Sequence, residues 1–204
     1  MIIVNHLPDP SLGHLVREYY YFNSGKQPHS RLVPVIDDGC YDIIFFKEQD
    51  SALLSGPEQK AYPIPYKVFT IHQLNPPYKI QFGESLTFFT IKVQPWANRH
   101  FFNVLENPGI QDLLKTNHEL ASFHKTVFTS ISPEEKFDLA DTLMAEQQQS
   151  MSPATLWVKE ICEAIYKEHG MTSVSGLSKA FGKSRQYMNR IFKQEVLYSL
   201  KQFI

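Results

Sequence analysis

The sequence has few cysteines and no long apolar run. Only two cysteines, Cys40 and Cys162, occur in 204 residues, which provides neither a disulfide framework nor the close cysteine spacing of a zinc site. No run approaches the roughly 18 apolar residues of a membrane-spanning helix. The opening residues, MIIVNHLPDP, lack the basic stretch of a secretory signal peptide. We therefore expect a protein of the reducing cytoplasm without a membrane partner.

The motifs of the common enzyme classes are also missing. The chain contains no G-x-S-x-G, no P-loop and no G-x-G-x-x-G sequence. Its eight histidines are scattered, and none forms an H-x-H pair. A catalytic metal needs three or four ligands that converge on one site, whereas scattered histidines are usually surface or core residues. We expect no enzymatic activity, no catalytic residue, no metal site and no cofactor.

The first half of the chain has the pattern of a β-rich domain. Short runs of β-branched and aromatic residues predict strands at 19–22, 31–36, 41–46, 52–54, 66–72, 78–82 and 86–93. Turn residues at Asp37-Asp38-Gly39 predict a hairpin between strands 31–36 and 41–46, and Gly83-Glu84-Ser85 predicts one between 78–82 and 86–93. Many short strands separated by turns favour a sandwich or a barrel.

After Pro95 the spacing of apolar residues becomes helical. It predicts helices at 96–104, 110–115 and 118–128, a helix that starts at Ser132-Pro133, and another from Ser152-Pro153 to about His169. The polar stretch 147–151 is the best boundary in the chain. We therefore divide the protein into residues 1–150 and 151–204.

Residues 174–192 predict two short helices joined by a tight turn at Gly182-Lys183. Ser184 has the position of an N-cap for the second helix. Apolar residues mark one face of each helix: Val174, Leu177, Phe181, then Met188, Ile191, Phe192. The other face of the second helix carries long polar side chains: Arg185, Gln186, Asn189, Arg190 and Lys193. This is the plan of a helix-turn-helix unit, although a plain helical hairpin with a solvated face gives the same pattern.

The charge distribution favours the helix-turn-helix interpretation. Residues 155–204 hold eight Lys/Arg and four Asp/Glu, a formal charge of +4. Residues 1–154 hold the remaining twelve Lys/Arg and seventeen Asp/Glu, a charge of −5, so the chain as a whole is at −1. A basic tail on an acidic body suits a nucleic-acid partner.

This C-terminal region resembles the first helix-turn-helix of AraC/XylS-type transcription regulators. The resemblance rests on residues 180–186 (AFGKSRQ), 190–193 (RIFK) and 199–204 (SLKQFI). Met188 stands where that family has leucine, Leu200 where it has proline, and Leu197 where it usually has a turn glycine. Members of the family have two such units in tandem, and we expect this chain to lack the second.

The N-terminal part is similar to the sensor domain of some AraC-like regulators. The matching segments are 38–45 (DGCYDIIF), Gly56-Pro57 and 90–97 (TIKVQPWA). The resemblance implies a cupin-like β-barrel with a helical tail, used for effector sensing or dimerisation. The expected fold is thus α+β: a cupin-like barrel with C-terminal helices, followed by an all-α helix-turn-helix domain.

Aromatic residues on the predicted strands are the candidates for a small-molecule effector site. Tyr41, Phe45, Phe69 and Phe89 lie on segments that could line a barrel interior, and apolar pockets are the usual small-molecule sites. The alternative is that these rings simply fill the interior, as in most small barrels.

Together, these observations predict a sequence-specific DNA-binding regulator that forms a homodimer. Arg185, Gln186, Asn189 and Arg190 would face bases in the major groove of double-stranded DNA. Lys183, Ser184 and Lys193 would contact phosphates. The alternatives are a ligand-binding or protein-interaction module without DNA binding and, less favoured for want of a histidine cluster, a cupin-type enzyme.

Overall fold

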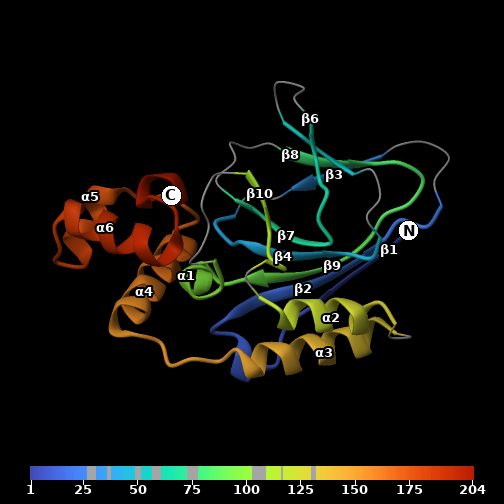
Figure 1. The fold of residues 1–204 in the computed structure, drawn as a ribbon. Coiled ribbons are helices and arrows are strands. Elements are labelled where there is room, and N and C mark those ends of the chain that lie inside the picture. The colour runs from blue at the N-terminus through green and yellow to red at the C-terminus, as the bar shows by residue number, and fades with distance from the viewer. Residues whose placement is uncertain are drawn as a thin grey trace. The chain divides into compact units, whose positions relative to one another are not determined.

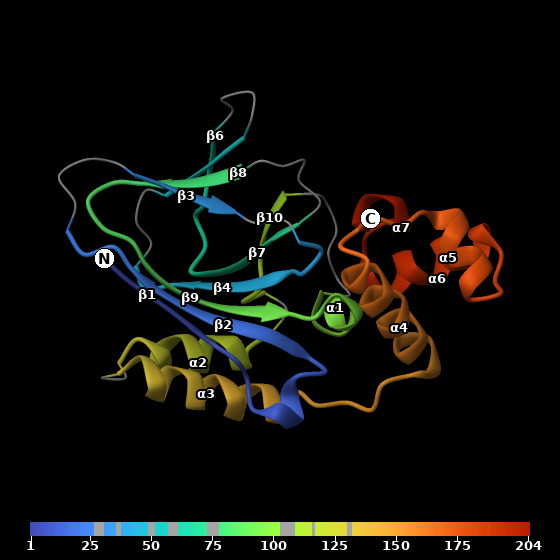
Figure 2. The same ribbon diagram turned by 180° about the vertical axis from the view of Figure 1, so that it is seen from behind.

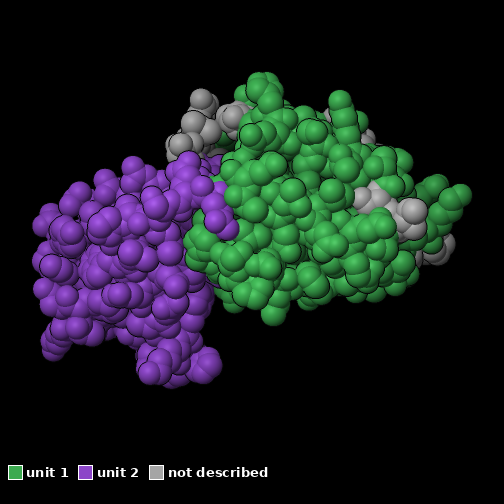
Figure 3. Space-filling view, turned by 90° about the horizontal axis from the view of Figure 1, so that it is seen from below, with its two compact units in different colours: residues 1–37, 41–93, 104–147 green, residues 38–40, 94–103, 148–204 purple. Residues whose placement is uncertain are grey.

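The computed structural model describes residues 1–26, 31–35, 38–48, 52–56, 61–72, 78–102, 109–115, 117–129 and 132–204. The chain folds into two compact units (Figure 3). Unit 1 comprises residues 1–37, 41–93 and 104–147, and unit 2 comprises residues 38–40, 94–103 and 148–204. The division into domains 1–150 and 151–204 stays a prediction. No helix among the described residues is long and apolar enough to cross a bilayer.

Unit 1 is built on two antiparallel sheets (Figure 1). Sheet A has the strand order β1 (Ile2–His6), β2 (Val16–Asn23), β9 (Thr87–Val93), β4 (Asp42–Phe46), β7 (Val68–His72), β10 (Gly109–Asp112). Sheet B has the order β3 (Arg31–Val35), β8 (Tyr78–Phe82), β5 (Leu53–Ser55), β6 (Ala61–Pro63). A short 3-10 helix, η1 (Pro10–Leu12), links β1 and β2.

The two faces of sheet A bury different partners. Sheet B covers one face, and helices α2 (Glu119–Val127) and α3 (Pro133–Glu146) cover the other (Figures 1 and 2). Alternation along β4 sends Phe46 into the core between the sheets and Phe45 toward α2, where it meets Phe123 at 4.9 Å between ring centroids. The predicted α+β class is confirmed. The described strands stay in two separate sheets and do not show the expected closed barrel.

Both predicted hairpins are wrong. β3 pairs with β8, whereas β4 pairs with β9 and β7, so the turn at Gly39 carries the chain from one sheet to the other. The turn at 83–85 does the same between β8 and β9. Turn residues fix a change of direction but not the partner of a strand, which depends on the faces that are buried. Asp37 of the first predicted turn, and Pro57, lie outside the described residues.

The predicted helix at 110–115 is also wrong. Residues 109–112 form β10, which pairs with β7, and Leu113 N–H donates to Val68 O at 3.0 Å. Four residues are too few for helical spacing to distinguish a helix from an edge strand, and the backbone groups at the open edge of β7 need partners. The strands β1 and β6 were not expected from the pattern.

Unit 2 contains the remaining helices. These are η2 (Pro95–Ala97), α1 (Asn98–Phe102), α4 (Pro153–Lys167), α5 (Val174–Ala180), α6 (Arg185–Val196) and α7 (Leu200–Phe203). The predicted helices at 118–128, from Ser132 and from Ser152 are confirmed as α2, α3 and α4. Of the predicted helix 96–104, residues 103–104 lie outside the described part.

Residues 38–40 pack with the C-terminal helices of unit 2. Gly39 has φ +77°, and a Cβ built on it would lie 2.2 Å from the ring of Phe203 in α7. Tyr166 of α4 directs its hydroxyl to Asp38 O at 3.4 Å. Only a glycine allows both this backbone conformation and this close approach.

Candidate nucleic-acid interface

Each of the helices α4, α5, α6 and α7 begins at a serine. Each serine hydroxyl accepts a hydrogen bond from the backbone N–H three residues further along the chain. The distances are 3.1, 3.0, 3.2 and 3.3 Å for Ser152, Ser173, Ser184 and Ser199. A serine cap satisfies one of the N–H groups that a helix start leaves without a partner. The starts of α4, α5, α6 and α7 are therefore fixed by local sequence, and the predicted cap at Ser184 is confirmed.

The turn between α5 and α6 depends on Gly182. It has φ +62°, and no atom lies within 4 Å of the position of an added Cβ. Glycine is thus needed here for its backbone conformation and not for space. Lys183 N–H donates to Ser178 O at 3.2 Å, and the Ser178 hydroxyl donates to Lys183 O at 2.6 Å. These two bonds close the predicted turn.

The inner faces of the helices form one apolar core. The fully buried members are Val158, Ile161, Cys162 and Ile165 of α4, Met188, Phe192 and Val196 of α6, and Leu200 of α7. The Phe192 ring meets that of Phe203 at 5.1 Å. This core fixes the rotation of α6, so the opposite side of that helix faces solvent.

The outer side of α6 holds the residues predicted to contact DNA. Six of the seven are exposed, and Asn189 is half-buried: Lys183, Ser184, Arg185, Gln186, Asn189, Arg190 and Lys193. The structure thus brings them together at the start and along one face of a single helix. Four cations among them give this face donors for phosphate oxygens and base edges.

Tyr187 lies within this face and was missed in the sequence. The residue is 42% exposed, and its ring carries the Arg190 guanidinium at 5.4 Å and the Lys183 amino group at 5.9 Å. Trp157 of α4 supports the ring from behind at 5.7 Å. The spacing of 183, 187 and 190 along one helical face was the signal available. Tyr187 braces both cations and limits the conformations that they can adopt.

The C-terminal end of α6 is held by residues from α1 and α4. The fully buried Asn98 donates from Nδ2 to Val196 O at 2.9 Å and to Gly39 O at 3.3 Å. Buried Glu195 accepts from Arg99 at 2.7 Å and from the Thr155 hydroxyl at 3.0 Å. These polar contacts fix the axis of α6, which a helix needs if its side chains are to meet base edges in register.

Leu197 ends α6 in a left-handed conformation. Its φ is 65°, and its N–H donates to Lys193 O at 3.1 Å. Glycine or asparagine normally takes this position because a side chain strains it. The helix end is therefore that of a glycine-capped helix, although the residue is leucine.

The four aromatic residues predicted to bind an effector do not meet in one pocket. Phe45 and Phe89 lie under α2, with Phe123 at 4.9 and 5.8 Å. Phe69 faces sheet B and packs on Phe46 at 4.8 Å. All four rings, that of Tyr41 included, are buried. Their burial agrees with the alternative, in which the rings fill the core.

Tyr41 faces His72 at 6.0 Å between ring centroids. Both ring nitrogens of His72 and the hydroxyl of Thr70 are buried, and none of the three has a hydrogen-bond partner among the described residues. Burial holds the pKa of His72 below its ordinary value. The ring is therefore neutral in the folded protein at neutral pH.

Among the described residues, no three His, Cys, Asp or Glu side chains gather as a metal site would require. Cys40 and Cys162 are both buried in unit 2, and they form no disulfide among the described residues. Burial raises the pKa of the Cys162 thiol well above its usual value, so it is a poor nucleophile.

Comparisons with known proteins gave one family and several distant structures. No curated protein matches the chain. The AraC-like transcriptional activator CuxR is 11% identical with a TM-score of 0.37, over 94% of this chain and 80% of that one. ToxT from Vibrio cholerae is 9% identical with a TM-score of 0.33, over 91% of this chain and 96% of that one. The complex of Vibrio cholerae ToxT with (E)-4-(8-methylnaphthalen-1-yl)but-3-enoic acid is 9% identical with a TM-score of 0.36, over 100% and 98%.

The family match covers most of unit 1 and the segment that leads into α1. The family model described as "Domain of unknown function (DUF6597)" matches residues 4–107, which is half of the chain. It therefore includes nearly every strand of both sheets. The chain belongs to the DUF6597 family.

Proposed function

We propose that this protein is a sequence-specific DNA-binding transcription regulator of AraC type. The observation that supports it best is α6: its apolar side is buried, and its other side presents three exposed cations together with the amides of Gln186 and Asn189. A solvated face without a partner would not need this concentration of bidentate donors. In a major groove, Arg pairs with guanine and Asn or Gln with adenine.

In this proposal α5 and α6 act as a helix-turn-helix. Arg185, Gln186, Asn189 and Arg190 face bases, while Lys183, Ser184 and Lys193 contact phosphates and set the register. The charge of +4 on residues 155–204 attracts the duplex and makes binding sensitive to salt. Tyr187 would hold Arg190 in a conformation suited to one base pair.

Unit 1 is the proposed cupin-like sensor and dimerisation domain of a cytoplasmic regulator. A single helix in one groove buries too little surface for high specificity. Two copies on adjacent half-sites would raise the effective affinity without a new type of contact. A small-molecule effector bound to unit 1 would then change how two reading helices are presented.

The test is selection of DNA sites by the full chain from a random duplex library, followed by binding measurements at several salt concentrations. We expect enrichment of one motif and an affinity that falls steeply with salt. Arg190→Ala should lose about 1–3 kcal/mol on the selected site and relax the preference at one base pair. Lys193→Ala should weaken the binding of all DNA sequences alike. It should also lower the slope of log affinity against log salt concentration by about 1.

Lys167→Gln is the matched control, because Lys167 is an exposed cation of α4 outside the α6 face. It should change the affinity much less than Arg190→Ala. If no duplex binds even at low ionic strength, or if Lys167→Gln lowers the DNA affinity as much as Arg190→Ala does, the proposal is wrong. The first result would favour a ligand-binding or interaction module.

A further inference from the structure

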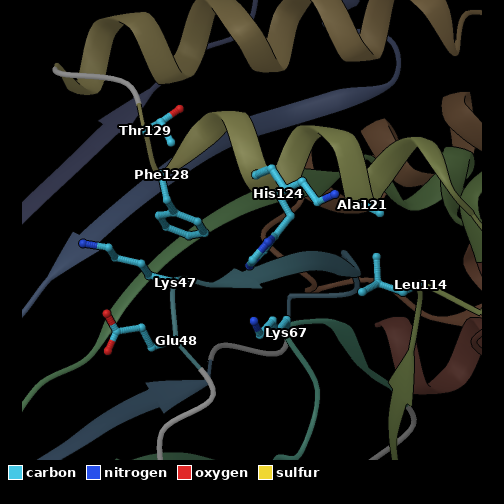
Figure 4. Close-up of a pocket in the computed structure, with 9 residues that line it drawn as sticks. Lys47, Glu48, Lys67, Leu114, Ala121, His124, Phe128 and Thr129 are labelled. Carbon is cyan, nitrogen blue, oxygen red and sulfur yellow. The ribbon is translucent and has the colours of Figure 1, made fainter.

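A hollow of about 470 Å³ lies in unit 1, where β4 ends and β7 begins beside α2 (Figure 4). Its volume is in the range of small-molecule sites. The lining comes from the segments after β4, before β7 and after β10, and from α2 with the two residues that follow it: Lys47, Glu48, Lys67, Leu114, Ala121, His124, Lys125, Phe128 and Thr129. None of the four aromatic residues predicted from the sequence lines it.

Backbone contacts hold two of its lysines side by side. Phe46 N–H donates to Lys67 O at 2.8 Å, and Lys47 N–H donates to Thr87 O at 2.9 Å. The two chain segments are thus joined where Lys47 and Lys67 leave the sheet. The backbones of Lys47 and Lys67 belong to strand ends, so no loop has to be ordered at these positions when a ligand binds.

The lining also has an apolar part, and His124 of α2 lies beside it. Leu114, Ala121 and Phe128 supply hydrocarbon surface. His124 Nε2 lies 2.7 Å from Phe46 O. A carbonyl only accepts, so Nε2 carries the proton of this hydrogen bond. Phe128 meets the imidazole edge-on at 5.4 Å and keeps it in place.

The charge of the hollow is positive. Three lysines line it against one glutamate, and among the described residues none of these three ammonium groups has an ion pair. In Figure 4 Lys67 and the ring of His124 point toward one another, whereas the amino end of Lys47 points away from them. Of the two lysines that leave the sheet, Lys67 is thus the one that lies toward His124.

We propose that this hollow binds a small organic monoanion: one carboxylate attached to a flat apolar body. The carboxylate pairs with Lys67, and the apolar body lies against Ala121, Leu114 and Phe128. Glu48 at the rim disfavours ligands with several negative charges, because its carboxylate repels them. The proposal deepens the sensing role proposed for unit 1, but it does not depend on DNA binding.

The test uses the ¹⁵N-labelled full chain and three probes: trans-cinnamate, the neutral trans-cinnamamide and inorganic phosphate. We expect cinnamate to shift the backbone amides of Ala121, His124 and Leu114 at lower concentration than cinnamamide does, and phosphate not to shift them. Lys67→Gln should weaken cinnamate by about fivefold, the upper range for an exposed ion pair, and leave cinnamamide unchanged. Ala121→Leu fills the hollow and should remove the shifts by both aromatic probes.

Lys79→Gln provides the control, since Lys79 is an exposed lysine of β8 in sheet B. It should leave the affinity for cinnamate unchanged. The proposal is overturned if cinnamate and cinnamamide bind the native chain equally, if phosphate shifts the same amides, if no probe shifts them, or if Lys79→Gln costs as much as Lys67→Gln. DNA is absent from these measurements, so failure here leaves the DNA-binding proposal intact, and failure to bind DNA leaves this one intact.

Discussion

The local sequence determines the helices of unit 2, but it does not determine how the strands of unit 1 pair. In unit 2 each of the helices α4 to α7 starts at a serine whose hydroxyl caps it. In unit 1 the strand β4 lies between β9 and β7, whose residues are far away in the sequence. Helical signals are read within four residues, whereas strand partners depend on the whole set of buried faces.

The largest effect on stability should come from unit 1, where one aromatic ring contacts several residues that are far apart in the sequence. Phe89 is fully buried and contacts Tyr19, Phe45, Phe123 and Phe137 at 5.8 to 6.3 Å between ring centroids. Phe89→Ala should lower the free energy of unfolding by about 3–5 kcal/mol, because it leaves a cavity. Urea unfolding followed by far-UV circular dichroism measures this.

Tyr62→Ala is the control in the same unit, since Tyr62 is an exposed residue of the short β6. It should change the free energy by no more than about 0.5 kcal/mol. A similar cost for both variants would mean that the core around Phe89 is loosely packed, and the contrast between the units would weaken.

The next effect tests whether residues 94–103 are part of unit 2. Asn98→Ala removes the Nδ2 group, which donates both hydrogen bonds, and leaves Val196 O and Gly39 O without this partner. The cost should be about 2 kcal/mol, within the range for breaking buried hydrogen bonds. Both tryptophans, Trp96 and Trp157, are in unit 2, so urea unfolding followed by tryptophan fluorescence reports on the right unit.

Asn189→Ala is the paired control, on the outer side of α6. It should have little effect on stability, while DNA affinity falls if Asn189 reads a base. An Asn98→Ala variant as stable as the native chain would show that α1 does not hold the end of α6.

The same contrast explains which parts of the fold could be predicted. The helix starts at Ser132, Ser152 and Ser184 follow from local residues, and the outer face of α6 follows from helical spacing. The placement of residues 94–103 with the C-terminal helices could not be predicted, since it depends on Asn98 reaching Val196 O across about one hundred positions. No spacing rule connects such positions.

The candidate sites divide in the same way. The seven α6 residues lie on one face because a helix places them there. The four aromatic residues were chosen as strand residues of unknown facing, and β4 and β7 turn them to both sides of sheet A. The hollow beside α2 was missed because Lys47 and Lys67 lie at strand ends, where alternation gives no information.

A smaller effect should come from the local cap of α6. Ser184→Ala removes the acceptor for Tyr187 N–H and should cost about 1 kcal/mol. Ser184→Asp keeps an acceptor and should remain near the native stability. Hydrogen exchange at the Tyr187 amide measures the local effect, and equal protection in both variants would mean that packing alone holds the first turn.

The smallest effect concerns the other end of α6 and depends on the backbone alone. Leu197→Gly and Leu197→Ala remove nearly the same side chain, but only glycine is relaxed at φ 65°. The glycine variant should therefore be more stable than the alanine variant by about 0.5 kcal/mol, the reverse of the order inside a helix. Urea unfolding followed by tryptophan fluorescence measures the difference. If alanine is the more stable, residue 197 is not left-handed in solution, and this helix end, like the strand partners of unit 1, is decided by distant contacts.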